Sequence, residues 1–202
     1  ANIRKALKVA ETVAPCVLWL DEIEKAMAGA PQGAADGGVS ADALGTVLSW
    51  MQDRAGSVFV VATANDVSAL PPELMRKGRF DELFFVDLPT AQERAAILAT
   101  ALRAHGRDDA LHTLHQVAAA TAEFTGAELA ALVPDALFAA FADGERQICT
   151  EDLLTAAAAT VPLARTAAEK IAALRTWAKG RARPATTPSA TTAPGNVRTL
   201  DI

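Results

Sequence analysis

The feature that most constrains the fold is a pair of short apolar runs, CVLWL at residues 16–20 and SVFVVATA at residues 57–64. Runs of this length, rich in Val, Leu and aromatic residues, are typical of strands buried on both faces of a parallel sheet. Between them lie a Gly-, Ala- and Pro-rich loop at 29–38 and a helical pattern with Ser40 as its N-cap. A third apolar run follows at 82–88. Strands that alternate with helices predict an α/β fold with a doubly wound parallel sheet.

Beyond Pro89 the pattern changes to Ala-rich helical segments, and nothing in them requires a strand. Thr90 with Glu93 three residues later fits a capping box, which marks the start of the first of these helices. The final stretch is rich in Pro, Thr and Ala and has no apolar period, as in flexible linkers. The predicted domains are an α/β domain at 1–89, a small all-α domain at 90–162, a C-terminal helix at 163–180 and a flexible tail at 181–202.

The composition narrows the class of protein. Of 202 residues, 51% are hydrophobic and 21% are charged, which suits a well-buried globular protein, with Trp19, Trp50 and Met51 expected in the core. The formal charge of −5 gives no bulk attraction to nucleic acid or to an anionic membrane, so neither is an expected partner. No apolar stretch reaches the roughly 18 residues of a membrane span. Two distant cysteines without metal-ligand spacing favour a reducing, cytoplasmic location.

Acidic and amide side chains stand directly after the first two predicted strands. Asp21 and Glu22 follow the first strand, and Asn65 follows the second. Because the carboxyl ends of parallel strands share one crevice, these groups are expected to converge. A Mg²⁺-nucleotide site needs a carboxylate for the ion and a second group for the attacking water, and this set supplies both. Taken alone, the acidic pair more often marks a strand leaving the core, and Asn65 a turn.

A short basic segment precedes the third apolar run. Arg76, Lys77 and Arg79 place three cations close together. Such runs are usually solvated surface, but the guanidinium fork of arginine matches phosphate geometry, and an arginine that reaches a γ-phosphate can raise the rate by about 10³ to 10⁵. Both interpretations remain open from these residues alone.

Four segments, in this order, resemble motifs of the AAA ATPase family. CVLWLDE is similar to the Walker B segment, ATAND to the sensor-one strand, and LMRKGRFDELFFVDLP to the second region of homology with its arginine fingers. FTGAELAALVPDALFAAF resembles the lid helix that starts with Gly-Ala-acid. The GRFD pattern resembles the AAA clade proper. APCVLWLDEIEK and the segment VPLARTAAEKIAALRTWAKGRARPA further resemble stand-alone AAA proteins of bacteria, cyanobacteria and chloroplasts.

The resemblance implies a role for each matching residue. Asp21 would support Mg²⁺ through water, Glu22 would polarise the attacking water, and Asn65 would sense the γ-phosphate of ATP. Arg76 and Arg79 would reach into the site of an adjacent subunit. Activity would then depend on a ring, typically a hexamer in this family.

Gly126 and Ala127 begin the segment that resembles the lid helix. The resemblance implies that these small residues let the helix approach the adenine closely. An ordinary helix N-terminus is the alternative, and the residues alone leave both interpretations open.

The most important departure of the chain from the family is an absence. The chain contains no G-x-x-x-x-G-K-[ST] phosphate loop, so the resemblance implies a partial doubly wound parallel sheet that lacks the P-loop half of a P-loop NTPase fold. Because the downstream residues are intact and the chain opens inside a helical pattern without Met, we interpret this as truncation and expect the isolated chain to be inactive. The second departure is mild: Glu24 stands where the family usually has Asp.

The leading hypothesis is therefore the C-terminal part of an AAA ATPase. It would bind and hydrolyse ATP with Mg²⁺ in a ring and couple hydrolysis to remodelling of a protein substrate that the sequence does not identify. The alternative is a truncated, non-catalytic interaction or regulatory module, which the missing phosphate loop motivates. A DNA helicase or clamp-loader subunit is disfavoured by the acidic balance and the GRFD pattern.

Overall fold

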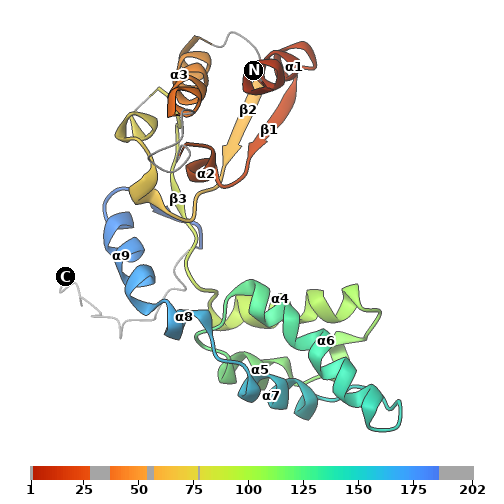
Figure 1. Ribbon diagram of the computed structural model, residues 1–202. Helices are drawn as coiled ribbons and strands as arrows, with labels where there is room; N and C mark the ends of the chain where they lie inside the picture. Colours follow the sequence, from red (N-terminus) through yellow and green to blue (C-terminus); the bar gives the residue numbers. More distant parts are fainter. Residues whose placement is uncertain (1, 28–36, 54–56, 77, 187–202) are drawn as a thin grey trace, which may run out of the picture. The chain divides into compact units, whose positions relative to one another are not determined.

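A computed structural model describes residues 2–27, 37–53, 57–76 and 78–186 of the chain (Figure 1). The chain divides into two compact units, Ala1–Leu83 and Phe84–Ile202. We call them the α/β unit and the helical unit. Residues 84–89, which the sequence places in the α/β domain, group with the helical unit. No helix among the described residues is long and apolar enough to cross a membrane.

The α/β unit is built on two parallel strands, β1 (Cys16–Leu20) and β2 (Val58–Ala62). Their register pairs Cys16 with Val58 and Leu20 with Ala62, so the two strands end side by side. The unit also contains α1 (Asn2–Thr12), α2 (Ile23–Met27), α3 (Gly37–Asp53) and the 3₁₀ turns η1 (Val67–Ala69) and η2 (Pro72–Met75). Its buried core consists of Leu7, Ile23, Val47, Met51 and Leu74.

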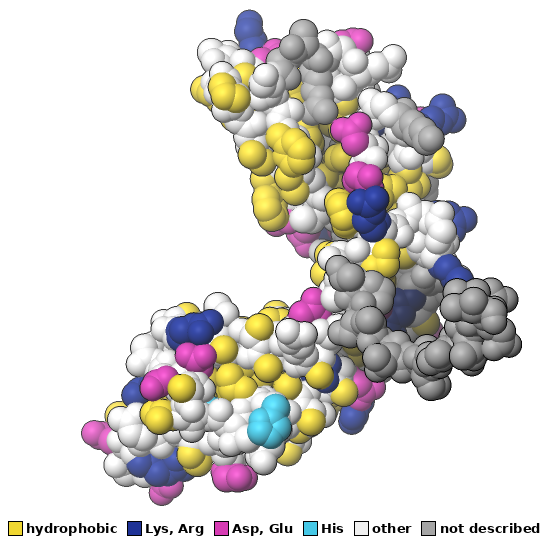
Figure 2. All heavy atoms as spheres, turned by 180° about the vertical axis from the view of Figure 1, so that it is seen from behind, with side chains coloured by type: hydrophobic (Ala, Val, Ile, Leu, Met, Phe, Trp, Pro, Cys, Tyr) yellow, Lys and Arg dark blue, Asp and Glu magenta, His cyan; other side chains and the backbone are white. Residues whose placement is uncertain are grey.

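One face of this sheet is exposed, so the prediction of strands buried on both faces is wrong for the described chain. The side chains of Val17, Trp19 and Phe59 are 64%, 62% and 69% exposed. Val17 pairs with Phe59 across the sheet, so these residues share a face, which we call the open sheet face. Hydrophobic side chains gather on the surface of this unit in Figure 2. Trp19 is therefore not a core residue, whereas Met51 is.

The third apolar run does not extend this sheet. Only Phe84–Phe85 form a strand, β3, which pairs in parallel with β4 (Arg183–Pro184). The Asp87 carboxylate explains the early end of β3: it accepts the backbone N–H of Leu88 at 2.7 Å and binds the guanidinium of Arg175. The sequence predicted a strand over the whole run because its apolar pattern hides this polar turn.

The helical unit packs six α-helices of the described chain, together with the 3₁₀ turn η3 (Asp109–Leu111), and its core lies among α4 to α7. Leu98, Leu102, Leu129, Leu132 and Leu153 are fully buried there. The helices are α4 (Ala91–Ala104), α5 (Leu114–Ala120), α6 (Gly126–Ala142), α7 (Thr150–Ala159), α8 (Leu163–Thr166) and α9 (Ala168–Ala178).

The ends of these helices follow the capping signals in the sequence. The Glu93 N–H donates to Thr90 Oγ1 at 3.3 Å, and the Thr90 N–H donates to Glu93 Oε2 at 2.7 Å, which completes the predicted capping box. Thr186 Oγ1 also donates to Glu93, at 2.7 Å. Ordered structure therefore continues beyond residue 180, and the rest of the predicted tail, from 187, lies outside the described residues.

Candidate active site

The carboxyl ends of β1 and β2 bring the predicted acidic and amide residues together. Asp21 and Glu22 directly follow β1, and Asn65 stands three residues after the end of β2. The Nδ2 of Asn65 donates to Glu22 Oε1 at 3.0 Å. This contact arises because the parallel register places Leu20 beside Ala62, so both chains leave the sheet at the same edge.

Glu22 is the most constrained residue of this edge. Its φ is +47°, in the left-handed region that non-glycine residues seldom adopt and that is enriched at functional sites. Its second oxygen, Oε2, binds Lys25 Nζ at 2.6 Å. The hydrogen bond to Glu22 is the largest cause of a raised Lys25 pKa. The Glu22 carboxylate is thus oriented from two sides, and each oxygen keeps a further lone pair for a water molecule.

Thr63 was not singled out from the sequence, although it holds both acids. Its Oγ1 donates to Asp21 Oδ1 at 2.5 Å and accepts the backbone N–H of Glu22 at 3.0 Å. The sequence did contain a signal for Thr63. A hydroxyl residue stands at the end of one predicted strand, and two acids directly follow the other.

Glu24 is the second residue that the sequence analysis undervalued. Its side chain is only 6% exposed, and Oε1 accepts the backbone N–H of Asn65 at 3.1 Å. Oε2 is buried and has no hydrogen-bond partner in the described part of the chain. Glu24 therefore supports Asn65 through the backbone N–H of Asn65. The feature that could have singled it out is an acidic residue on the inward side of the short helix α2.

The two predicted arginine fingers differ in their surroundings. Arg76 directly follows η2, is exposed, and its guanidinium contacts no acid or carbonyl of the described chain. Arg79 is half-buried and donates from Nη1 to the carbonyl oxygen of Glu73. Neither binds the acids at the sheet edge within this chain, and Lys77 lies outside the described residues. Arg76 is consequently the more accessible of the two cations.

Gly126 and Ala127 form the first turn of α6 in the helical unit. Thr125 caps this helix, with the Glu128 N–H donating to Thr125 Oγ1 at 3.3 Å and Glu128 Oε2 accepting the Thr125 N–H at 2.8 Å. A Cβ built on Gly126 would meet only Ile97 Cδ1, at 3.7 Å, an ordinary van der Waals contact. Packing inside the unit therefore gives no reason for glycine at this position.

Asp21 fits a magnesium ion held through water. Thr63 occupies Oδ1, while Oδ2 accepts no hydrogen bond from the residues that the structure describes. Mg²⁺ commonly keeps several waters and takes one or two carboxylates together with substrate phosphates. The described residues hold no group of three or more His, Cys, Asp or Glu side chains that could bind a metal on their own. A water-mediated role for one carboxylate agrees with both observations.

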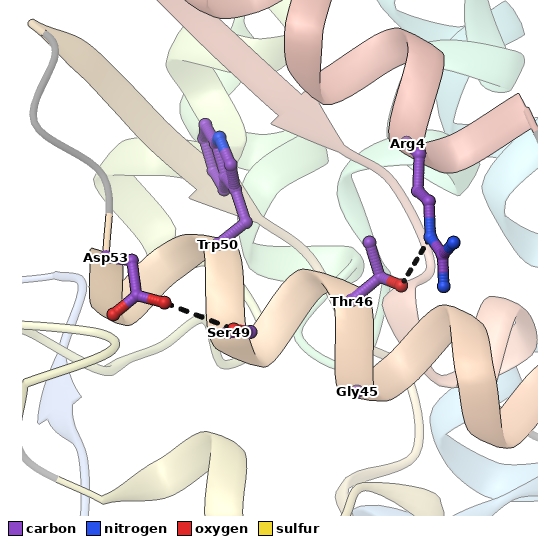
Figure 3. A pocket seen from close by; sticks show the side chains of 6 residues that line it. All are labelled: Arg4, Gly45, Thr46, Ser49, Trp50 and Asp53. Carbon is purple, nitrogen blue, oxygen red and sulfur yellow. Dashed lines mark hydrogen bonds between the residues drawn. The ribbon is translucent and has the colours of Figure 1, made fainter.

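A shallow pocket of about 480 Å³ lies away from this edge, between α1 and α3 (Figure 3). Two hydrogen bonds join polar side chains that line it: Arg4 Nε donates to Thr46 Oγ1 at 3.3 Å, and Ser49 Oγ donates to Asp53 Oδ2 at 3.2 Å. It contains none of the predicted site residues. The pocket therefore gives no support for a second reacting centre.

The α/β unit has paired acids after one parallel strand and an amide after the other, and a helical unit follows it in the chain. This arrangement is typical of AAA-type nucleotide-binding proteins. Residues 1–88 match the family model described as "ATPase family associated with various cellular activities (AAA)". The chain is 41% identical over 186 residues to the uncharacterized AAA domain-containing protein ycf46 of Pyropia yezoensis, covering 91% of this chain and 37% of that protein. It belongs to the AAA family.

More distant relatives and solved structures agree. The ATP-dependent zinc metalloprotease FtsH of Caldicellulosiruptor bescii is 34% identical over 166 residues, or 78% of this chain and 26% of FtsH. The crystal structure of the FIGL-1 AAA domain superposes with a TM-score of 0.72 at 18% identity, covering 90% of this chain and 62% of that one. The same domain in complex with ADP gives 0.71 at 19% identity. The predicted fold class is thus confirmed, and the chain spans about a third of the length of its ycf46 relative.

Proposed function

We propose that the protein carrying this chain hydrolyses ATP with Mg²⁺ at the edge formed by β1 and β2. The observation that carries the proposal is the 3.0 Å hydrogen bond between Asn65 Nδ2 and Glu22 Oε1, because it joins the predicted water-activating acid to the predicted sensor. Membership of the AAA family supports an ATPase-type function.

The contacts at the sheet edge support a proposed role for each residue there. The bound Mg²⁺ and ATP would supply the reacting phosphoryl group and neutralise part of its charge. Glu22 accepts a proton from the attacking water, and Asn65 keeps the Glu22 carboxylate aligned for it. Asp21 would hold Mg²⁺ through water, with Oδ2 as the freer carboxylate oxygen. Gly126 and Ala127, which carry no bulky side chain, would leave room for the adenine at the start of α6.

The arginines extend the proposal to an assembly. Arg76 is exposed and has no partner among the described residues, so it is available to a neighbouring molecule. A guanidinium that enters the next site from a ring neighbour would stabilise charge in the transition state. Arg79, which is tied to the Glu73 carbonyl, would assist from a more fixed position. We propose a ring of subunits that remodels a protein substrate.

The test uses the full-length protein with Glu22→Gln, which keeps the size of the side chain and removes its basicity. We expect turnover to fall by about 10² to 10⁴, with ATP affinity changed by less than about threefold. Glu169→Gln on α9 is the matched control, since Glu169 is exposed and outside the site. Turnover near the wild-type level in Glu22→Gln would remove Glu22 from the mechanism.

Mixing variants tests the assembly. Arg76→Ala alone should lower turnover, whereas a mixture of Arg76→Ala and Glu22→Gln subunits should regain part of it, because some sites then combine an intact Glu22 with an intact neighbouring Arg76. No recovery at any mixing ratio would contradict action across subunits. A wild-type protein without ATPase activity would instead favour a non-catalytic interaction module.

A further inference from the structure

We propose that Thr63 is a positioning residue for hydrolysis, which sets the direction of Asp21 and Glu22 at the same time. The inference rests on the proposed ATPase function and deepens it. Thr63 directly follows β2, whereas the two acids directly follow β1, and Thr63 contacts both acids. It would therefore couple the metal-holding carboxylate to the water-activating one.

The hydroxyl has only one arrangement of its hydrogen that satisfies both contacts. An ionised carboxylate can only accept, so the single hydrogen of Thr63 Oγ1 points at Asp21 Oδ1, 2.5 Å away. A lone pair of the same oxygen then faces the Glu22 N–H, 3.0 Å away. Because Oδ1 already accepts this hydrogen, Oδ2 is the oxygen of Asp21 that keeps both of its lone pairs for hydrated metal.

The backbone of Thr63 completes a clamp around the turn. Its N–H donates to the Leu20 carbonyl at 3.0 Å, and its carbonyl accepts the Ile23 N–H at 2.9 Å. Together with the bond from the Glu22 N–H to Oγ1, these contacts flank the residue whose φ is +47°. Strained backbone persists only where its surroundings determine it, and Thr63 supplies that determination here.

The strained turn matters because it points Glu22 at Asn65. Loss of the hydroxyl leaves the two backbone bonds in place but frees the Glu22 N–H and Asp21 Oδ1. The fold should survive, while both carboxylates gain freedom. A hydroxyl that merely finished the end of β2 would affect stability alone and would not change metal dependence or turnover.

The experiment compares Thr63→Val with Thr63→Ser in the full-length protein. Valine keeps the branched shape without the hydroxyl, and serine keeps the hydroxyl. For Thr63→Val we expect kcat to fall about tenfold or more and the Mg²⁺ concentration for half-maximal rate to rise about tenfold, with KM for ATP within about twofold. Thr63→Ser should stay within about threefold of wild type in all three. Thermal unfolding of both variants monitors the fold.

A second measurement does not depend on activity. Hydrogen exchange followed by mass spectrometry, on a peptide that contains Glu22, should be faster by about tenfold in Thr63→Val and unchanged in Thr63→Ser. Wild-type kcat and Mg²⁺ dependence in Thr63→Val, or an equal loss in both variants, would overturn the inference while the ATPase assignment stands. An inactive wild-type protein would overturn the proposed function, whereas an active Glu22→Gln protein would remove Glu22 from the mechanism. Exchange unchanged in Thr63→Val would reject the clamp in either case.

Discussion

Gly126 allows packing and ligand binding to be separated at a single residue. Gly126→Ala adds a methyl group that meets only Ile97 Cδ1 at an ordinary distance, and alanine at a compatible helical position restricts the unfolded chain. We expect the free energy of unfolding to stay equal or rise by up to about 1 kcal/mol. Nucleotide affinity should nevertheless weaken severalfold, measured with a fluorescent ATP analogue on the full-length protein.

Gly106 provides the matched control. Its φ is +68°, so Gly106→Ala should destabilise the helical unit by about 1 kcal/mol without weakening nucleotide binding. Wild-type affinity in Gly126→Ala would show that the glycine is an ordinary helix start and not a ligand contact.

The sequence anticipates some site residues better than others, for a physical reason. Asp21, Glu22 and Asn65 could be named because polar groups after buried strands of a parallel sheet must meet at one edge. The signals for Thr63 and Glu24 are weaker, since their partners are a neighbouring carboxylate and a backbone N–H that only the strand register and the turn at Glu22 bring within reach. The pattern of strands in the sequence thus predicts which polar residues gather at the sheet edge. The residues that hold them in place depend on the geometry of the turns, which the sequence pattern does not show.

At the scale of the element, the start of α7 depends on one carboxylate. Asp152 receives two hydrogen bonds from Arg146, at 2.7 and 2.8 Å, and the Cys149 N–H at 2.8 Å. The Arg146 bonds are the main reason that the pKa of Asp152 lies far below its ordinary value, against the opposing effect of burial. Asp152→Asn should therefore lower the free energy of unfolding by about 1 to 3 kcal/mol at pH 7.

The depressed pKa fixes the sign of the pH dependence. A carboxyl whose folded pKa lies below its unfolded value, near 4, stabilises the fold above that value and loses this contribution as the pH falls toward the folded pKa. The difference between wild type and Asp152→Asn in urea unfolding should thus shrink below about pH 4. Asp143→Asn is the control, because Asp143 binds the same arginine but is 73% exposed. A difference that is constant from pH 7 to pH 3 would contradict the role of charge.

Elements also differ in how far the sequence determines them. The capping box at Thr90 is local, so its residues alone predicted the start of α4 correctly. The run at 82–88 was expected to be a strand of the main sheet, yet β3 has two residues and its partner is Arg183–Pro184, about 100 residues later in the chain. Such a pairing depends on the distant C-terminal segment and on the Asp87–Arg175 contact, which no local pattern reveals.

At the scale of the whole molecule, the open sheet face explains the mismatch between sequence and structure. Uninterrupted apolar runs are the pattern of strands covered on both sides, but Val17, Trp19 and Phe59 are exposed in the described chain. The FIGL-1 AAA domain is longer than the matching part, since this chain covers 62% of it. An uninterrupted apolar run thus indicates a strand that is suited to burial on both faces, even where the described residues leave one face exposed.

Substitutions on the two sides of the sheet test this description. Trp19→Ser in the 202-residue chain should change the free energy of unfolding by less than about 0.5 kcal/mol, because the side chain is already 62% exposed. Met51→Ala should cost about 2 to 5 kcal/mol, since Met51 is 3% exposed in the core of the same unit. Urea unfolding at several protein concentrations measures both. A large cost for Trp19→Ser would mean that the face is covered in solution, and a cost that grew with concentration would identify a second copy of the chain as the cover.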